Sequence, residues 1–263
     1  MNLDLVLEVA IESAHAAGAI LREGARQETR PAQAKAHPHD PVTPFDRAAE
    51  RAIVARLTER FPEHGILSEE GTDARPTAQY RWIIDPLDGT NNFVQGIPHY
   101  AVSIALMEQQ APRVACIYDP IREERFTAVV GQGARINERP IAVSSHEGLD
   151  GITLAVGYSI WPERRRRLHD MAAPLLDRAR AIRTTGSAAL DLAYVAAGRF
   201  DATWYLSLSP WDVAAGILLI REAGGRVTDL TGVESSDPEG GVLATNGRLH
   251  PAMIHIASGQ VAP

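Results

Sequence analysis

Carboxylates that could hold divalent cations are concentrated in the segment Asp85–Thr90, at the end of an apolar run. The run predicts a strand that carries Asp85 to its end, where the next residue, a proline, stops the hydrogen-bond ladder because it has no N–H. Asp88 follows three residues later, and Gly89 allows a tight backbone path into a helix that would begin at Thr90. Two carboxylates beside one turn can converge on a pair of cations, and the helix would offer N–H groups to an anion. A solvated turn is the alternative, because Asp-Pro and Asp-Gly pairs are common in loops.

Further acidic residues also stand at predicted element boundaries. Glu69 and Glu70 follow a short apolar run, and Asp46 and Asp212 each stand at the start of a predicted helix. Each of these alone fits an ordinary helix cap or a solvated turn. No His or Cys accompanies them at metal-ligand spacing. Taken together, the oxygen ligands therefore favour a hard cation such as Mg²⁺ over zinc.

The elements that must position these carboxylates begin with helices. The apolar spacing predicts one helix from residue 3 to about residue 24 and another over 46–61, with a loop over 30–41 between them. From residue 65 short apolar runs separated by turn residues predict sequential strands, and the short turns favour an antiparallel sheet. The predicted strands are 65–68, 81–85, 101–107, 113–118 and 125–130.

After residue 150 strands and helices alternate, which predicts an α/β arrangement with largely parallel strand pairing. The predicted strands are 152–157, 181–184, 201–205, 225–228 and 242–245, and the predicted helices are 163–178, 187–197 and 211–223. A polar linker at 144–150 marks a candidate boundary. We therefore predict an N-terminal α+β sub-domain, 1–145, that carries most of the acidic candidates named above, and a C-terminal α/β sub-domain, 146–263, that supplies Asp212.

Composition restricts the classes of partner. The 263 residues carry a net charge of −7, which argues against general binding to nucleic acids or anionic membranes. A phosphate substrate stays compatible with this charge, because bound cations make an acidic site locally positive. No run approaches the roughly 20 apolar residues of a membrane helix, and the N-terminus lacks the basic region of a signal peptide. The single cysteine, Cys116, allows no internal disulfide, so a soluble cytoplasmic protein is the expectation.

Several motifs resemble those of the inositol monophosphatase family. The segment 82–93 resembles the first signature of that family, and Trp211–Gly216, running on to residue 225, resembles the second. Segments at 43–46, 68–70 and 186–194 fit further motifs in the expected order, so the resemblance covers about residues 35–225. It implies a layered αβαβα sandwich of the inositol monophosphatase and fructose-1,6-bisphosphatase type. It also implies a homodimeric, lithium-sensitive, Mg²⁺-dependent phosphatase with two to three ions in each active site.

The resemblance further implies roles for individual residues at the reacting phosphate. The metal ligands would be Glu69, Asp85, Asp88, Asp212 and the carbonyl of Leu87. Asp46 and Thr90, together with Glu69, would orient the attacking water and take its proton, in an in-line displacement assisted by two cations. Asp88 and the backbone of Gly89 and Thr90 would contact the phosphate.

Other residues would face the alcohol part of the substrate or the metal waters. By the same resemblance, the substrate pocket would be lined by Gly186, Ser187, Ala188 and Tyr205. Lys35 and Glu70 are further candidates near the metal waters, although Lys35 also fits a solvated loop.

The resemblance leaves the substrate open at one position. In the inositol-cleaving branch a Glu seven residues before the second-signature Asp contacts ring hydroxyls, and here that position is Tyr205. A tyrosine offers one hydroxyl where a glutamate offers two acceptor oxygens, unless Tyr205 only packs. Inositol 1-phosphate is the leading substrate. Fructose 1,6-bisphosphate, histidinol phosphate, 3′-phosphoadenosine 5′-phosphate and NADP are the alternatives, and a non-enzymatic regulatory protein that kept the fold is a third hypothesis.

Two remaining features have competing interpretations. The run Arg164–Arg167 could bind a second phosphate or a partner, but a charged helix face is usually only solvated. His99 is expected to be structural.

Overall fold

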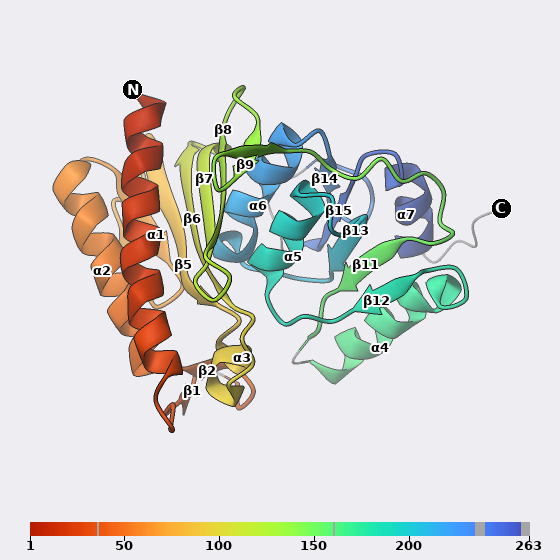
Figure 1. Cartoon of the computed structure of the whole chain (residues 1–263), viewed down its shortest axis with the longest axis horizontal. Coiled ribbons are helices and arrows are strands. Elements are labelled where there is room, and N and C mark those ends of the chain that lie inside the picture. The colour runs from red at the N-terminus through yellow and green to blue at the C-terminus, as the bar shows by residue number, and fades with distance from the viewer. Residues whose placement is uncertain (36, 160, 235–239, 259–263) are drawn as a thin grey trace.

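Helices cover both faces of two sheets and give the molecule five layers (Figure 1). The layers are, in order, α1 (Leu3–Ala25) with α2 (Pro44–Arg60), an eight-stranded sheet, α5 (Ala188–Ala196) with α6 (Pro210–Glu222), a five-stranded sheet, and α4 (Pro162–Ala172) with α7 (His250–Ala257). The structure is a computed structural model that describes residues 1–35, 37–159, 161–234 and 240–258. The predicted αβαβα sandwich is confirmed.

The two N-terminal helices form where their apolar spacing predicts them. α1 buries a stripe that includes Val6, Ala10, Ala17 and Leu21 against the eight-stranded sheet. α2 begins two residues earlier than predicted, at Pro44, because Thr43 caps it and a proline fits the first helical position. Asp46 therefore lies in the first turn of α2 and not before it.

The eight-stranded sheet presents the end of its strand β5 to the site. Its strands are β3 (Gly65–Ser68), β4 (Asp73–Ala74), β5 (Tyr80–Asp88), β6 (Ala101–Glu108), β7 (Ala111–Asp119), β8 (Glu124–Val129), β9 (Ala134–Ile136) and β10 (Arg139–Ile141), in the spatial order β10-β9-β8-β7-β6-β5-β3-β4. All neighbours are antiparallel except β3 and β5. The antiparallel prediction is thus confirmed for all but one pair.

The five-stranded sheet is only half parallel, so the prediction of largely parallel pairing was wrong. Its order is β12 (Ala181–Arg183), β11 (Thr153–Val156), β13 (Ala202–Tyr205), β15 (Val242–Thr245) and β14 (Arg226–Thr228). β11 runs parallel to β12 and β13, whereas β15 runs antiparallel to both β13 and β14. No helix of the described residues lies between β14 and β15, and without a crossover two successive strands that pair must run in opposite directions.

Several short elements differ from the prediction. The expected loop over 30–41 contains a small antiparallel pair, β1 (Gln33–Ala34) and β2 (Pro41–Val42). α4 ends at Ala172 and not at 178, because the chain passes into a 3₁₀ turn, Ala173–Leu175, that contains a proline. The short helix α3 (Thr90–Gln95) begins at Thr90 as expected, whereas β4, β9, β10 and α7 were not predicted.

The buried core links the two halves of the chain. One hydrophobic cluster joins the apolar sides of α5 and α6 to β6, β7 and β8 of the eight-stranded sheet. A second lies under α1 and α2, and a third lies between the five-stranded sheet and the helices α4 and α7. The division into sub-domains at residue 145 stays a prediction.

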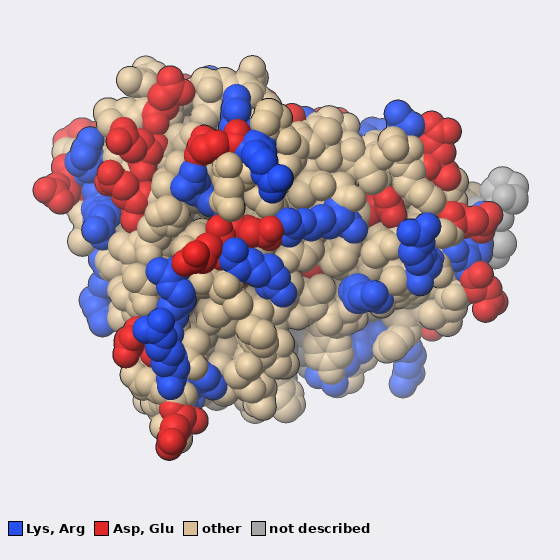
Figure 2. Space-filling model, in the orientation of Figure 1, with Lys and Arg blue, Asp and Glu red and all other residues tan. Residues whose placement is uncertain are grey.

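Charges of both signs are interspersed on the surface. On the face shown in Figure 2, acidic and basic side chains lie close to one another over most elements. Among the described helices, none combines the length and the apolar composition that a bilayer span requires.

Candidate active site

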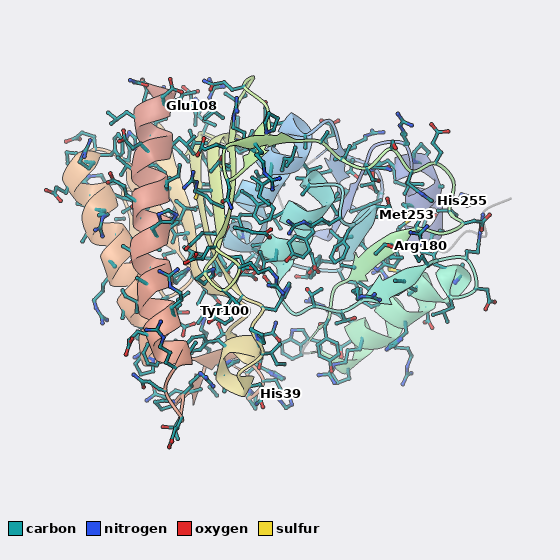
Figure 3. All side chains as sticks on the ribbon, viewed as in Figure 1. His39, Tyr100, Glu108, Arg180, Met253 and His255 are labelled. Atoms are coloured by element: carbon teal, nitrogen blue, oxygen red, sulfur yellow. The ribbon has the colours of Figure 1, made fainter. Side chains whose placement is uncertain are left out.

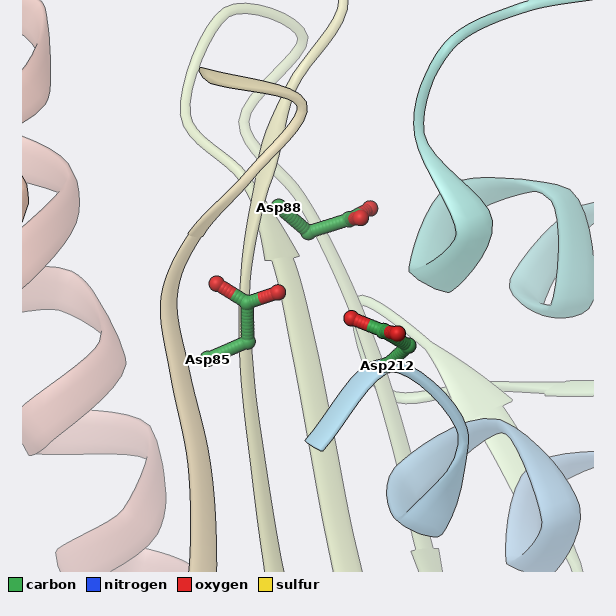
Figure 4. Close-up of side chains that lie close together, drawn as sticks. All are labelled: Asp85, Asp88 and Asp212. Atoms are coloured by element: carbon green, nitrogen blue, oxygen red, sulfur yellow. The ribbon is translucent and has the colours of Figure 1, made fainter. Parts of the chain in front are cut away.

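Three aspartates from two distant parts of the chain meet at one point between the central layers. Carboxylate oxygens of Asp85, Asp88 and Asp212 all lie within 4.8 Å of one another (Figure 4). Asp85 and Asp88 come from the end of β5, and Asp212 comes from the first turn of α6. The structure therefore brings together three of the predicted metal ligands.

A local irregularity of β5 places the first two carboxylates. The pairing of β5 with β6 shifts register between Asp85 and Asp88, because Pro86 interrupts the ladder. The backbone N–H of Leu87 donates to Asp85 Oδ1 at 3.0 Å, which orients that side chain. Gly89 follows with a φ of +96°, and a Cβ there would lie 3.2 Å from the carbonyl oxygens of Gly186 and His99. Only glycine adopts this backbone conformation readily in so crowded a place.

Helix starts hold the carboxylates of Asp88 and Asp212 in place. Asp212 Oδ2 accepts the backbone N–H of Ser209 at 2.7 Å, in the capping box of α6. Asp88 accepts the backbone N–H groups of Ala188 at 3.2 Å and Ala189 at 2.9 Å, and the hydroxyl of Ser187 also donates to it. Asp88 thus binds the N-terminus of α5, and Ser187 contacts this carboxylate where substrate contact was predicted.

Glu69, Glu70 and Lys35 form the adjoining side of the cluster. The Lys35 ammonium lies 2.8 Å from Glu69 Oε1 and 2.7 Å from Glu70 Oε1. Glu69 and Asp85 lie within hydrogen-bonding reach of each other, which connects this group to the aspartates. Lys35 is a half-buried ion-pair partner and not a solvated loop residue.

Asp46 and Thr90 meet beside the aspartates. The Thr90 hydroxyl lies 3.0 Å from Asp46 Oδ1 and 3.0 Å from the carbonyl oxygen of Leu87. A hydroxyl carries a single proton, so it donates to one of these two acceptors at a time. Asp46 is fully buried, and its Oδ2 accepts the backbone N–H of Thr43 at 2.9 Å.

The buried carboxyl groups raise one another's pKa values. Burial raises the pKa of Asp85 and of Asp212 well above the ordinary value, and the charge of Glu69 raises both further. Burial raises the pKa of Asp88 to about 6, although its hydrogen bonds from Ser187 and α5 oppose the rise. Burial also raises the pKa of Asp46. So many acidic oxygens in one buried place fit divalent cations, which would offset the repulsion.

A cavity of about 570 Å³ opens from the aspartates toward α3 and α4. Its lining includes Asp88 and Asp212, together with Gly186, Ala188 and Tyr205 of the predicted substrate contacts. His39, from the connection between β1 and β2, lies beside α3 at one edge (Figure 3). The remaining lining residues are Asn91, Asn92, Tyr158, Arg165, Thr184, Thr185 and Leu208.

Tyr205 is tied to a carboxylate that sequence reasoning missed. Its hydroxyl donates to Asp191 Oδ2 at 2.6 Å, and Thr185 donates to Asp191 Oδ1 at 2.7 Å. Asp191 is fully buried, and burial raises its pKa to about 7. Asp191 lies within the segment 186–194 that resembles a family motif. The sequence alone does not indicate that Tyr205 and Thr185 are its hydrogen-bond partners.

The other two uncertain features also have defined places. Of the run Arg164–Arg167, the side chain of Arg165 lines the cavity, whereas the other three are exposed on α4. His99 is largely buried, its ring lies against Tyr194, and burial lowers its pKa. This environment fits the structural role predicted for His99.

Comparison with known proteins extends the likeness over the whole chain. The model of the inositol monophosphatase family matches residues 2–262. The Nus factor SuhB of Pseudomonas aeruginosa is 40% identical over 255 residues, which are 95% of this chain and 94% of the relative. The Nus factor SuhB of Escherichia coli K12 is 40% identical over 251 residues, with the same coverage.

Solved structures agree. The extragenic suppressor protein suhB from Bartonella henselae superposes with a TM-score of 0.93 at 38% identity and covers 98% of this chain and 100% of its own. The inositol monophosphatase from Anabaena (Nostoc) sp. PCC 7120 gives a TM-score of 0.87 at 36% identity, with 99% and 98% covered. The family model matches the chain over its full length, and the fold is shared. The acidic cluster also suits the metals on which this family depends. This chain belongs to the inositol monophosphatase family.

Proposed function

We propose that the chain hydrolyses the phosphate monoester of a small polyol with the help of Mg²⁺, and that inositol 1-phosphate is its first expected substrate. The observation that carries the proposal is the convergence of Asp85, Asp88 and Asp212, of which Asp88 and Asp212 also line the cavity. Burial raises the pKa values of all three carboxyl groups, and the charges of neighbouring carboxylates raise them further. A group of buried acids with raised pKa values is typical of a functional site.

The donor set supports cation binding by Glu69, Asp85, Asp88, Asp212 and the carbonyl of Leu87. All are oxygens, which Mg²⁺ prefers, and the family is metal-dependent. Two or three bound ions would neutralise charge on the phosphate and acidify the attacking water. Lys35 would hold Glu69 and Glu70 in place through the two ion pairs described above.

Asp46 and Thr90 would take up the proton of the attacking water. When Thr90 donates its hydroxyl proton to Asp46, the lone pairs of its oxygen can accept a hydrogen bond from that water. The proton released in the attack can then pass through the Thr90 hydroxyl to Asp46. Its raised pKa makes Asp46 a stronger base than an exposed aspartate.

The proposal includes an assembly and a location. We expect a homodimer, to be checked by light scattering coupled to size-exclusion chromatography. We expect the cytoplasm, because Cys116 is buried as a free thiol, as a reducing compartment allows.

A substrate panel tests the function. The purified chain is incubated at millimolar Mg²⁺ with inositol 1-phosphate, fructose 1,6-bisphosphate, histidinol phosphate, 3′-phosphoadenosine 5′-phosphate and NADP, and released phosphate is measured. Hydrolysis of at least one ester, lost when the cations are chelated, supports the proposal, and the ranking of kcat/KM selects among the candidates. If no ester releases phosphate, the chain is better described as a regulatory or binding protein that has kept the fold.

A further inference from the structure

One arginine reaches the cavity from a run of four. Arg165 is half-buried and lines the cavity, whereas its neighbours Arg164, Arg166 and Arg167 are exposed. Its Nε donates to the carbonyl oxygen of Ser159 at 2.6 Å, and its guanidinium lies 4.7 Å from the ring centroid of Tyr158, which also lines the cavity. Stacking on an aromatic ring and a hydrogen bond at Nε hold the guanidinium in a defined orientation.

The wall around the alcohol side of the cavity carries no carboxylate among the described lining residues. The lining carboxylates, Asp88 and Asp212, belong to the cation cluster. Tyr205 occupies the position where the resemblance predicted a glutamate, and its hydroxyl is directed to the buried Asp191. A glutamate there would repel an anionic group on the substrate, whereas a neutral phenol does not.

The cavity thus has two ends of different chemistry. At one end the carboxylates are suited to cations and, through them, to the phosphate that is cleaved. At the other end Arg165 presents a positive charge beside the neutral side chains of Tyr158, Thr184 and Thr185. A volume of about 570 Å³ accommodates more than a phosphate group. A guanidinium is the side chain that binds phosphate and carboxylate groups in a planar, two-point manner.

We propose that Arg165 binds a second anionic group, a phosphate or a carboxylate, on the alcohol part of those substrates that carry one, and so favours them over the matched esters that lack it. The inference rests on the proposed phosphomonoesterase function and adds a specificity that the function alone does not require. Arg165 then acts as a specificity residue at a distance from the reacting phosphorus. Its contribution falls mainly on KM, because a contact present in both the bound substrate and the transition state strengthens binding without accelerating the chemical step.

Matched substrate pairs test the inference. Fructose 1,6-bisphosphate is compared with fructose 1-phosphate, and 2-phosphoglycerate with glycerol 2-phosphate, so that the two arms separate a second phosphate from a carboxylate. kcat and KM are measured at saturating Mg²⁺ for the wild type, Arg165→Gln, Arg165→Lys and Arg166→Gln. Arg166 is the matched control, since it is the exposed neighbour in the same run.

We expect the wild type to favour the doubly anionic member of at least one pair by roughly tenfold or more in kcat/KM, as a charge-assisted contact provides. Arg165→Gln should bring the KM values of that pair together, Arg165→Lys should retain part of the preference, and Arg166→Gln should retain all of it. Equal kcat/KM values within both pairs, or a preference that survives Arg165→Gln, overturn the inference while leaving the phosphatase function in place. Absence of turnover for every ester overturns the proposed function, and the inference with it.

Discussion

The hydroxyl of Tyr205 donates a hydrogen bond to Asp191, 2.6 Å away, and so joins the wall of the cavity to a buried acid behind it. Thr185, on the same wall, donates to the other oxygen of Asp191 at 2.7 Å. Asp191 thus holds two lining side chains at once, one from β13 and one from the segment before α5. Asp191 therefore positions Tyr205 and Thr185 in the lining of the cavity.

Replacing Tyr205 with phenylalanine should destabilise the fold and do so more at high pH. The variant keeps the ring but leaves one oxygen of Asp191 without its donor, at a cost of about 1–3 kcal/mol. Burial raises the pKa of Asp191 to about 7, so this acid is mostly protonated in the folded state at pH 5 and mostly ionised at pH 8. The loss should therefore be larger at pH 8, as measured by urea unfolding at both pH values.

A matched control for this variant is available on the surface. The Tyr80 hydroxyl donates to Glu108 at 3.0 Å, also a pairing of a phenol with a carboxylate but near solvent. Tyr80→Phe should change the free energy of unfolding by less than about 0.5 kcal/mol. Equal losses of unfolding free energy in Tyr205→Phe and Tyr80→Phe would show that the burial of Asp191 does not strengthen its hydrogen bond with Tyr205.

Changing Asp88 to asparagine should abolish activity without unfolding the protein. The amide oxygen can still accept hydrogen bonds from Ala189 and Ser187, but the N–H of Ala188 loses its acceptor and the negative charge of a predicted metal ligand is lost. We expect kcat to fall by about 100-fold or more, with an unchanged circular dichroism spectrum. Asp150→Asn, at an exposed ion pair with Arg178, is the control and should keep full activity. Turnover near the wild-type rate in the Asp88 variant would refute the assignment of Asp88 to the metal.

Without divalent cations, the carboxylate cluster should make the fold less stable as the pH rises. The pKa values of Asp85, Asp88 and Asp212 are raised in the folded state, so folding favours their protonated forms. Their stabilising contribution is complete below the unfolded pKa of about 4 and is lost as the pH rises through the folded pKa values, which for Asp88 is about 6. Melting temperatures recorded in EDTA between pH 4 and pH 8 measure this effect, and its slope should be smaller in Asp212→Asn.

Magnesium should restore the lost stability. At pH 7.5 a cation present at 100 times its dissociation constant stabilises the folded state by about 2.7 kcal/mol, which appears as a rise in melting temperature. At pH 5 protons compete for the same carboxylates, so the rise should be smaller. Asp212→Asn should weaken the response to Mg²⁺, and an undiminished response in that variant would contradict its role as a ligand.

His250 provides a pH effect of opposite sign, away from the site. Its ring is fully buried between the hydroxyls of Thr228 and Thr245, each 2.9 Å from a ring nitrogen, and burial lowers its pKa to about 4. Because the unfolded pKa is about 6.5, its contribution to stability is complete above that value and is lost as the pH falls toward 4. The loss between pH 6.5 and pH 4 should be roughly 3 kcal/mol. The stability of His250→Gln should depend less on pH between 6.5 and 4 than that of the wild type, and equal slopes would rule this contribution out.

The residue types at the site could be predicted from the sequence, but their convergence could not. Asp85 and Asp88 lie on one turn, so local pattern was enough to pair them. Nothing local indicates that Asp212 lies within 4.8 Å of them, and only the resemblance to a family suggested it. Physical reasoning from the residues alone left a solvated turn as an equal alternative.

Contacts between side chains on different helices and strands could not be predicted either, because local sequence does not indicate which distant residues meet. Asp191 lies on a helix and Tyr205 on a strand, and their contact depends on how α5 packs on the five-stranded sheet. Arg165 could not be separated from its three neighbours in the run, since the sequence does not show which side of α4 faces the cavity. The antiparallel placement of β15 likewise depends on its connection to β14, in which the described residues form no crossover helix.

The bonds from the start of α5 to Asp88 have a consequence for how the protein refolds. Their partners are 99 to 101 positions apart in the chain, so closing them costs more chain entropy than closing a local hairpin, and we expect them to form late in folding. The cluster of Asp85, Asp88 and Asp212 is complete only once the start of α5 has bound Asp88. Binding of Mg²⁺ during refolding should therefore begin only after α5 has bound Asp88, so the bound ion reports on a late step in the formation of tertiary structure.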